Sequence, residues 1–262
     1  MTLPAPFDLS GRVAIVTGAG SATGIGFATA SLLGGLGATV VLAATTERVF
    51  ERVAELAELG VDSSGFVGDL TDESTATALV TGAVDAWGQV DVVVNNAGMV
   101  SVAAPVFEGG TAPEMSLQTW HDSLQRNLDT AFLVTRAALP EMIERGWGRV
   151  VMVSSLTGPV MAIAGDVGYA TAKAGMVGFT RALAVDCAAH GVTVNAVAPG
   201  WIATGSQSLH EGAHGRTTPI GRSASPAEVA NTVAWFATPG ASYVTGQFLV
   251  VDGGNSIAEE RG

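Results

Sequence analysis

The chain of 262 residues lacks several features that would assign it to other protein classes. Its only cysteine, Cys187, has no partner, so the sequence excludes a disulfide scaffold. Charged residues make up only 14% and hydrophobic residues 48%, a balance that favours a packed core over disorder. The longest uncharged stretch, 13–46, is broken by glycine and hydroxyl residues, which makes it a poor membrane span and a better strand, loop and helix.

Positive charge is scarce. Twelve basic residues face 24 acidic residues, and the net charge is −12. Such a field repels phosphate backbones and anionic membrane surfaces, so we expect neither nucleic acid nor membrane as a partner. The first residues lack the basic start and apolar core of a signal peptide, and we therefore expect a cytoplasmic protein.

Lysine is almost absent, because Lys173 is the only lysine among the twelve basic residues. Lysine is a compact point charge on a flexible stem, whereas arginine is a broad planar fork. The position therefore indicates a site that arginine cannot serve, unless Lys173 is simply one survivor in a chain that otherwise uses arginine.

What the sequence does contain is a regular alternation of apolar runs and helical segments. The apolar runs, rich in β-branched residues, are 13–16, 39–42, 90–94, 150–153, 192–197 and 248–251, with 65–68 as a weaker seventh. The helical segments between them are 24–36, 47–59, 72–87, 116–138, 168–188 and 226–237. Continuous apolar strands separated by helices predict an α/β fold, a doubly wound, mostly parallel sheet of about seven strands.

No linker, repeat or low-complexity stretch divides the chain, so we expect one domain over residues 1–262. Segments 99–118 and 203–222 show no periodicity and are rich in small and polar residues. In a doubly wound sheet such loops at the carboxyl ends of strands bind ligands.

The first strand runs into the glycine loop Thr17-Gly18-Ala19-Gly20-Ser21-Ala22-Thr23-Gly24-Ile25-Gly26, which opens a helix. Glycines let the backbone approach a pyrophosphate, and the helix N-terminus favours its charge. The loop alone is compatible with an ordinary tight turn, but the strand and helix around it favour dinucleotide binding.

The end of the second predicted strand decides between the two nicotinamide cofactors. NAD enzymes usually place an acid there, but no acid follows Ala44 directly. Thr45, Thr46 and Arg48 are instead suited to a 2′-phosphate, although Arg48 also fits the first turn of a solvated helix. The sequence favours NADP(H) and leaves NAD(H) possible.

Tyr169 and Lys173 are four residues apart in a helical segment, so both lie on one face. A nearby ammonium favours tyrosinate and lowers the tyrosine pKa from about 10, which makes the phenol a usable acid or base. Ser154 and Ser155 follow the strand 150–153, where a hydroxyl can hold a substrate oxygen.

With these residues together, the sequence resembles the short-chain dehydrogenase/reductase family over residues 8–256. The resemblance rests on the glycine loop, Asn95-Asn96-Ala97-Gly98, Ser155, Tyr169-x-x-x-Lys173, Pro199-Gly200 with Thr204, and the ending 243–254. It implies a Rossmann fold, an NAD(P)-dependent ketone or alcohol oxidoreductase, and commonly a homotetramer.

The resemblance also implies roles for individual residues. Tyr169 would exchange the proton with the substrate oxygen, Ser155 would hydrogen-bond that oxygen, and Lys173 would bind the nicotinamide ribose. Asn127 would hold a water in a proton relay. The cofactor would lie against Gly18, Ser21, Thr23, Gly24, Ile25, Gly26, Asp69, Leu70, Asn96, Ala97, Gly98, Tyr169, Lys173, Pro199, Gly200, Ile202 and Thr204.

Three departures from the family pattern stand out. The glycine loop is two residues longer between Gly18 and Gly24, which affects its phosphate contacts. The spacing from Ser155 to Tyr169 is one residue longer than usual. The segment from Gly98 to Asn127 is several residues longer, and we expect an additional flap over the site there.

His210-Glu211-Gly212-Ala213-His214 matches the H-E-x-x-H zinc pattern. That pattern needs a helix, and Gly212 and Gly215 weaken one. We therefore expect no metal, and the family resemblance implies that 203–222 is the substrate lid. Trp201 is expected to form a wall of the substrate pocket rather than part of the core.

The substrate remains open between a free small-molecule ketone or alcohol and a 3-oxoacyl group on acyl carrier protein. Related reductases dock that acidic carrier with basic residues, and the matching positions here are Gly146 and His190, with only Arg145 adjacent. The charge of −12 also repels an acidic carrier, which favours a free ketone. A non-catalytic dinucleotide sensor and a structural interaction module are the remaining alternatives, although the complete set of catalytic residues argues against the sensor.

Overall fold

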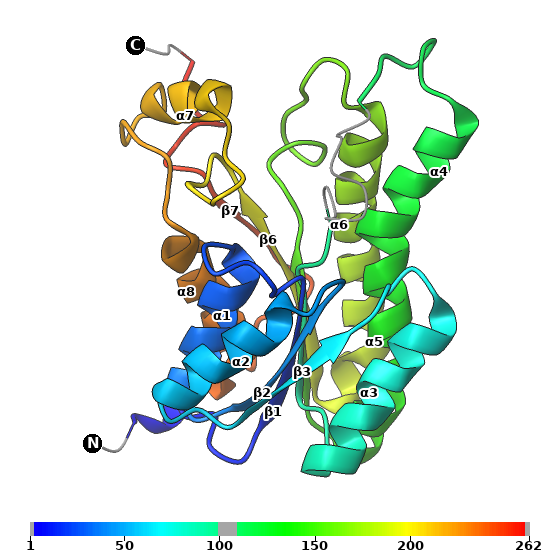
Figure 1. The fold of residues 1–262 in the computed structure, drawn as a ribbon, viewed down its shortest axis with the longest axis vertical. Coiled ribbons are helices and arrows are strands. Elements are labelled where there is room, and N and C mark those ends of the chain that lie inside the picture. Colours follow the sequence, from blue (N-terminus) through cyan, green and yellow to red (C-terminus); the bar gives the residue numbers. More distant parts are fainter. Residues whose placement is uncertain (1–2, 99–108, 260–262) are drawn as a thin grey trace.

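A computed structural model of the chain describes residues 3–98 and 109–259. Seven parallel strands form one sheet in the order β3-β2-β1-β4-β5-β6-β7 (Figure 1). The strands are β1 (Val13–Thr17), β2 (Thr39–Ala44), β3 (Ser63–Val67), β4 (Val92–Asn95), β5 (Gly148–Val153), β6 (Val192–Pro199) and β7 (Phe248–Val251). The predicted doubly wound parallel sheet is confirmed.

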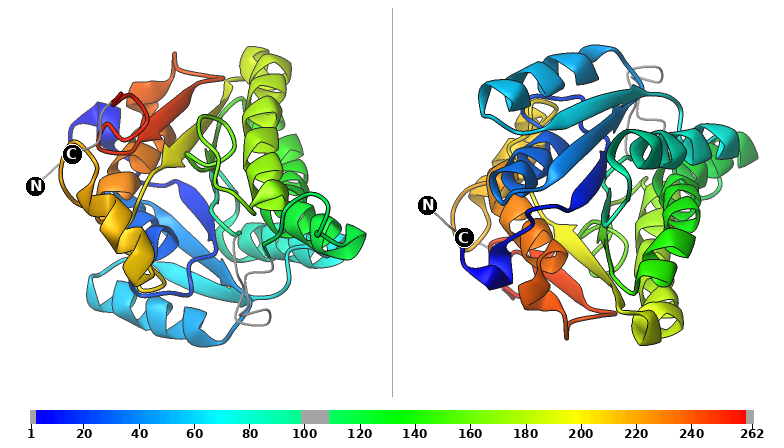
Figure 2. Two further views of the ribbon diagram at one scale, coloured as in Figure 1. Left: turned by 90° about the horizontal axis from the view of Figure 1, so that it is seen from above. Right: turned by 90° about the horizontal axis from the view of Figure 1, so that it is seen from below.

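Helices connect the strands and cover both faces of the sheet. They are η1 (Ala5–Phe7), α1 (Ile25–Gly35), α2 (Arg48–Glu58), α3 (Glu73–Trp87), α4 (Leu117–Leu124), η2 (Gln125–Asp129), α5 (Thr130–Arg145), α6 (Val167–Cys187), η3 (Ala188–His190), α7 (Leu209–Arg216), α8 (Pro226–Ala237) and η4 (Pro239–Ala241). Figures 1 and 2 show α1, α2 and α8 on one face and α3, α5 and α6 on the other. None of the helices in the described ranges is long and apolar enough to cross a membrane.

The alternation of side chains along each strand divides the core into two halves. Val13 and Ile15 of β1 pack with α3, α5 and α6, whereas Ala14 and Val16 pack with α1, α2 and α8. All five residues of β1 are buried, which explains the continuous apolar run in the sequence.

Helix ends follow the expected signals. Ser225 caps α8 and forms a capping box with Glu228, and Pro226 occupies the first helical position. Asp72 caps α3 through its side chain, which accepts from the Thr75 N–H.

The helix expected over 116–138 differs from the prediction. It begins at Leu117, passes through the π-helical turn η2, and continues as α5 to Arg145, with Pro140 inside. The helix ends only at Gly146, whose φ of +68° closes it in the left-handed conformation. A π turn inserts an additional residue, and a 3.6-residue period does not reveal it.

Segment 203–222 also differs, because it contains helix α7. Ser208 and Glu211 form a reciprocal capping box that satisfies the first turn. Gly215 is buried against Ser223, and a Cβ at this glycine would collide with the Ser223 Oγ. Gly212 and Gly215, which were expected to weaken a helix here, are both part of α7, because capping and close packing offset their low helix propensity. Residues 99–108 of the expected additional flap lie outside the described residues.

The fully buried carboxylate of Asp91 joins the amino ends of β1 and β4. It accepts from the Val13 N–H at 2.8 Å, from Arg12 Nη1 at 3.0 Å and from Arg145 Nη1 at 2.8 Å. Its oxygens therefore satisfy a strand N–H and two guanidinium groups at one point.

We expect Asp91→Ala to destabilise the fold by about 3 kcal/mol, because it leaves partly buried guanidinium groups unpaired. Chemical denaturation measures the change in unfolding free energy. The control is Arg136→Ala, which removes the exposed ion pair with Glu73 and should cost less than about 1 kcal/mol. Equal losses in the two variants would contradict the anchoring role of Asp91.

Candidate active site

The glycine loop packs against the residues that follow β4. Gly18 has a φ of +68°, and a Cβ there would lie 2.9 Å from both the Ala97 Cα and the Asn96 Nδ2. A Cβ at Gly26 would lie 2.6 Å from the same Asn96 nitrogen. Both positions therefore require glycine.

Asn96 and Thr17 join the carboxyl ends of β1 and β4. Asn96 Nδ2 donates to the carbonyls of Thr17 at 2.9 Å and Gly18 at 3.1 Å. The Thr17 hydroxyl accepts from the backbone N–H groups of Asn96 at 3.0 Å and Ala97 at 2.9 Å. Because the strand order reverses between β1 and β4, this junction is the topological switch point where doubly wound sheets bind ligands.

The N-terminus of α1 is suited to a phosphate. Its cap residue, Gly24, offers no side-chain cap, and the first turn carries no acid. Backbone N–H groups of Ile25 and Gly26 therefore begin the helix beside an open glycine loop, an arrangement that favours an anion.

The longer part of the glycine loop contacts segment 203–222, the expected lid, through Thr23. The Thr23 hydroxyl accepts a hydrogen bond from the Gly205 N–H at 3.0 Å. A Cβ at Gly205 would collide with that hydroxyl, so the approach is close. Thr23, expected against the cofactor, is thus engaged by the segment that follows β6, while Ser21 accepts through its carbonyl from the Gly24 N–H.

The end of β2 presents a cation. Arg48 is exposed at the start of α2, and its Nε donates to the Thr46 hydroxyl at 3.4 Å. Thr45 is also exposed beside them. The Ala19 N–H binds the Ala43 carbonyl at 3.0 Å, which holds the glycine loop beside this strand end.

Asp69 and Leu70 follow β3. One carboxylate oxygen of Asp69 accepts from the backbone and hydroxyl of Thr71 at 3.0 and 2.8 Å, and Leu70 is buried. This turn orients the chain into α3 and leaves Asp69 at the same edge of the sheet as the other strand ends.

Helix α6 brings Tyr169 and Lys173 to one face. The ammonium of Lys173 is buried, donates to the Val153 carbonyl at 3.0 Å, and lies 5.6 Å from the centroid of the Tyr169 ring. Ser155 hydrogen-bonds the Tyr169 side chain. Ser154 instead donates to the Lys173 carbonyl at 2.8 Å, so it anchors the helix and leaves Ser155 as the hydroxyl that faces Tyr169.

The π turn η2 positions Asn127, which is buried. Its Nδ2 donates to the Ser123 carbonyl at 3.0 Å. A Cβ at Gly98 would lie 2.6 Å from Asn127 Oδ1 and 3.2 Å from Lys173 Nζ, so the amide and the ammonium approach the backbone of Gly98 together. Such turns are frequent at functional sites.

Burial dominates the ionisation of these groups. It raises the pKa of Tyr169 to about 12, although the hydrogen bond with Ser155 acts to lower it. Burial lowers the pKa of Lys173 to about 8. The expected net lowering of the tyrosine pKa is therefore not met, because desolvation is the largest effect on it.

Two acids that the sequence analysis missed also act on Tyr169. The negative charges of Asp166 and Glu211 each act to raise its pKa. Asp166 lies three residues before Tyr169, a spacing that places it on the same helix face, and this signal was available in the sequence. Glu211 reaches the site only because α7 folds over it.

The segment after β6 returns across the end of the sheet. The Pro199 carbonyl accepts from the Leu156 N–H at 2.9 Å, and a Cβ at Gly200 would lie 2.8 Å from the Asp252 Cβ. Ile202 forms an isolated β-bridge with Ala224. Thr204 shares a hydrogen bond with Ser206 at 3.0 Å.

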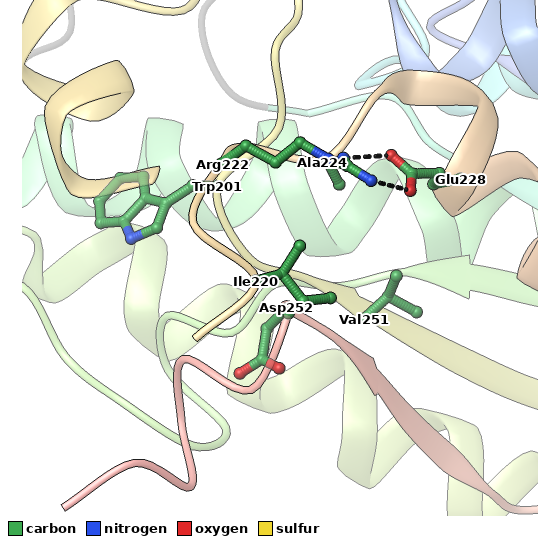
Figure 3. Close-up of a pocket in the computed structure, with 8 residues that line it drawn as sticks. Trp201, Ile220, Arg222, Ala224, Glu228, Val251 and Asp252 are labelled. Carbon is green, nitrogen blue, oxygen red and sulfur yellow. Dashed lines mark hydrogen bonds and ion pairs between the residues drawn. The ribbon is translucent and has the colours of Figure 1, made fainter. Parts of the chain in front are cut away.

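Trp201 stacks on His214 of α7 with ring centroids 5.1 Å apart. It also borders a cavity of about 90 Å³ between the lid and the end of β7 (Figure 3). The cavity is lined by Trp201, Ile220, Arg222, Ala224, Glu228, Val251, Asp252 and Gly253. It is smaller than ligand pockets of roughly 300 Å³ and its lining does not include Tyr169, so it is separate from the candidate catalytic residues.

The H-E-x-x-H residues lie on α7, with His210 Nε2 3.1 Å from His214 Nε2. Glu211 is engaged in the capping box, where it accepts from the Ser208 N–H at 2.6 Å. Within residues 3–98 and 109–259, no group of three His, Cys, Asp or Glu side chains is arranged to hold a metal. The glutamate thus serves the helix end here.

Known proteins are similar to this chain in sequence and in fold. A family model described as Enoyl-(Acyl carrier protein) reductase matches residues 18–256. The 3-oxoacyl-[acyl-carrier-protein] reductase of Vibrio cholerae is 38% identical over 251 residues, 94% of this chain and 98% of the relative. A crystal structure of a single-site variant of actinorhodin polyketide ketoreductase with NADPH has a TM-score of 0.85 at 38% identity, covering 94% of this chain and 98% of that chain. A dehydrogenase/reductase structure from Sinorhizobium meliloti has a TM-score of 0.86 at 29% identity, covering 96% and 97%.

The chain therefore belongs to the short-chain dehydrogenase/reductase family. It is an NAD(P)-dependent oxidoreductase that acts on carbonyl or hydroxyl groups.

We expect Gly26→Ala to destabilise the glycine loop by about 1–3 kcal/mol, because the methyl group would meet Asn96 Nδ2 at 2.6 Å. Thermal unfolding, with and without NADPH, measures the loss. Gly35→Ala is the matched control at the other end of α1, where a Cβ would meet nothing within 4 Å. An unchanged melting temperature in Gly26→Ala would disprove the close approach.

Proposed function

We propose that the chain uses NADPH to reduce a free, small-molecule ketone to a secondary alcohol. The observation that carries this proposal is the convergence of Ser155, Tyr169, Lys173 and Asn127 beside the switch point of the sheet. Two hydroxyls that share a hydrogen bond, with a buried ammonium behind one of them, are suited to a carbonyl oxygen that becomes an alkoxide.

The residues of the chain would handle the oxygen and its proton. Ser155 would donate a hydrogen bond to the carbonyl oxygen, and Tyr169 would give its proton as charge develops there. Lys173 would stabilise the resulting tyrosinate and contact the ribose, and Asn127 would hold a water that returns a proton. When bound, the cofactor supplies the hydride that forms the new C–H bond.

The same proposal assigns the cofactor to the open glycine loop and the neighbouring strand ends. Backbone N–H groups at the start of α1, uncapped by side chains, would bind the pyrophosphate. Asn96, Ala97 and Gly98 would line the cofactor from the other side of the junction, and Pro199, Gly200, Ile202 and Thr204 would face the carboxamide. Trp201 would flank the substrate.

Exposed Arg48, held toward Thr46, supports NADPH, because a guanidinium binds the 2′-phosphate that NADH lacks. NADH remains the alternative. The NADPH in the actinorhodin ketoreductase structure favours the same choice.

The charges of this chain favour a free ketone as substrate over a ketone bound to the acidic acyl carrier protein. Arg145, next to the position expected to dock acyl carrier protein, is held by Asp91 at 2.8 Å and by Glu141 at 3.2 Å. Its guanidinium is thereby neutralised, and the net charge of −12 repels an acidic carrier. The alternative is 3-oxoacyl-acyl carrier protein reduction, which the name of the Vibrio relative supports.

NADPH and NADH consumption tests this proposal, with a 3-oxoacyl thioester, a 3-oxo ester, an aryl ketone and a cyclic ketone as substrates. Turnover of a free ketone but not of the thioester is expected. A preference for the thioester would favour the carrier-linked alternative. Tight dinucleotide binding without turnover of any substrate would favour a sensor.

A homotetramer also remains a prediction, which sedimentation of the purified protein checks.

We expect Tyr169→Phe to lower kcat for reduction by at least about 10³-fold, because the variant lacks the proton donor. Tyr243→Phe is the matched control, since Tyr243 is the other tyrosine of the chain and is fully exposed. Comparable activity in both variants would show that another group donates the proton.

Lys173→Arg should lower kcat about 100-fold despite keeping the charge, because a planar fork cannot take the position of a buried ammonium on the Val153 carbonyl. Steady-state kinetics with the best ketone measures this. Full activity would mean that the single lysine reflects only the arginine usage of the chain.

Arg48→Ala should raise KM for NADPH roughly ten-fold and leave KM for NADH nearly unchanged, because only NADPH carries the 2′-phosphate. Arg136→Ala removes the same charge from the surface of α5 and serves as control. Equal increases for the two cofactors in Arg48→Ala would contradict the assignment.

A further inference from the structure

Three side chains of different chemistry lie close together at the start of α6. Lys173 follows Tyr169 by four residues of the helix, and Asp166, the cap residue three positions before Tyr169, lies close enough for its charge to act on the phenol. The cluster has a direction along the helix, from the carboxyl at its N-terminal end to the ammonium one turn after the phenol.

Lys173, at one end of this cluster, already has binding partners. Lys173 Nζ donates to the Val153 carbonyl and approaches Gly98 and Asn127 at the strand ends. In the proposed function this is the cofactor side. The substrate, which must reach Tyr169 without displacing the cofactor, therefore extends in the opposite direction, toward Asp166.

Asp166 is nine-tenths buried, with 9% of its surface exposed. It is the cap residue of α6, yet its side chain does not cap the helix. Among residues 3–98 and 109–259, no side chain or N–H group donates a hydrogen bond to its carboxylate. Its oxygens are not among the fully buried side-chain atoms that lack a partner, so they reach solvent, and a donor on a bound ligand can replace water there. Burial raises the pKa of Asp166 to about 6, so it is mostly ionised at neutral pH and accepts hydrogen bonds.

We propose that Asp166 is a substrate-binding residue that selects ketones carrying a hydrogen-bond donor, a hydroxyl or an ammonium, close to the carbonyl. Three residues of helix correspond to a rise of about 4.5 Å, which matches a donor on the carbon next to the carbonyl or one carbon further. The proposal rests on the proposed ketone reduction and names the substrate class of that same site.

The test uses three aryl ketones of similar size: 2-hydroxyacetophenone, 2-aminoacetophenone and propiophenone. They differ in carrying a hydroxyl, an ammonium or a methyl group next to the carbonyl. For the native enzyme, kcat/KM for at least one donor-bearing ketone should exceed that for propiophenone by about ten- to a hundred-fold, the usual effect of a hydrogen bond to a charged group. The ketone with the higher value identifies the donor.

Two variants of Asp166 separate the possible causes. Asp166→Ala should reduce the ratio between the donor-bearing ketone and propiophenone to near one. Asp166→Asn should retain much of a preference for the hydroxyl, because its amide oxygen still accepts, and lose a preference for the ammonium. Glu211→Gln is the matched control, since Glu211 also acts on Tyr169 through its charge. It changes the overall rate through that charge and retains the ratio.

The outcomes are distinguishable. If all three ketones are reduced equally by the native enzyme, or if Asp166→Ala keeps the native ratio, the role of Asp166 is disproved while ketone reduction stands. If none is reduced and the broader ketone panel is also inactive, the proposed function fails and the inference with it. Thermal unfolding verifies that the variants fold. If Asp166→Ala does not fold, Asp166→Leu, which also lacks an acceptor, takes its place.

Discussion

The junction between β1 and β4 is the constraint on which the rest of the site depends. Asn96 Nδ2 binds the carbonyls of Thr17 and Gly18, and the missing side chains of Gly18 and Gly26 permit that approach. These contacts set the position of the glycine loop relative to the end of β4. They also set where Gly98 meets Asn127 and Lys173, so the cofactor side and the catalytic side share one reference point.

The lid is connected to the same reference point. Thr23, in the longer part of the glycine loop, accepts from Gly205 at the start of the lid. Just before this segment, Trp201 stacks on His214 of α7. The longer glycine loop, a departure from the family pattern, thus makes a specific contact, the hydrogen bond between Thr23 and Gly205.

Much of this architecture was accessible from the sequence, for a physical reason. Strands buried on both faces are apolar at most positions, so the greater part of β1 and β5 was visible as continuous runs. The i, i+4 pair Tyr169 and Lys173 was visible because helix geometry fixes its spacing.

Other features depend on tertiary contacts that no local pattern encodes. The π turn at Asn127 and the continuation of α5 through Pro140 belong to this class. Helix α7 forms despite two glycines because Gly215 packs tightly on Ser223. The raised pKa of Tyr169 follows from burial, whereas spacing alone indicates the opposite direction.

The central claim is that Tyr169 of α6 gives its proton to the substrate oxygen and that Lys173, on the same helix face, stabilises the resulting tyrosinate. Lys173, with a pKa of about 8, holds its charge below that pH and loses it above, whereas Tyr169 stays protonated up to about 12. The most direct measurement is kcat/KM for ketone reduction as a function of pH. The account predicts a level profile between about pH 7 and pH 8, above the pKa of Asp166, and a decline above pH 8. A profile that stays level through pH 10 would contradict the account.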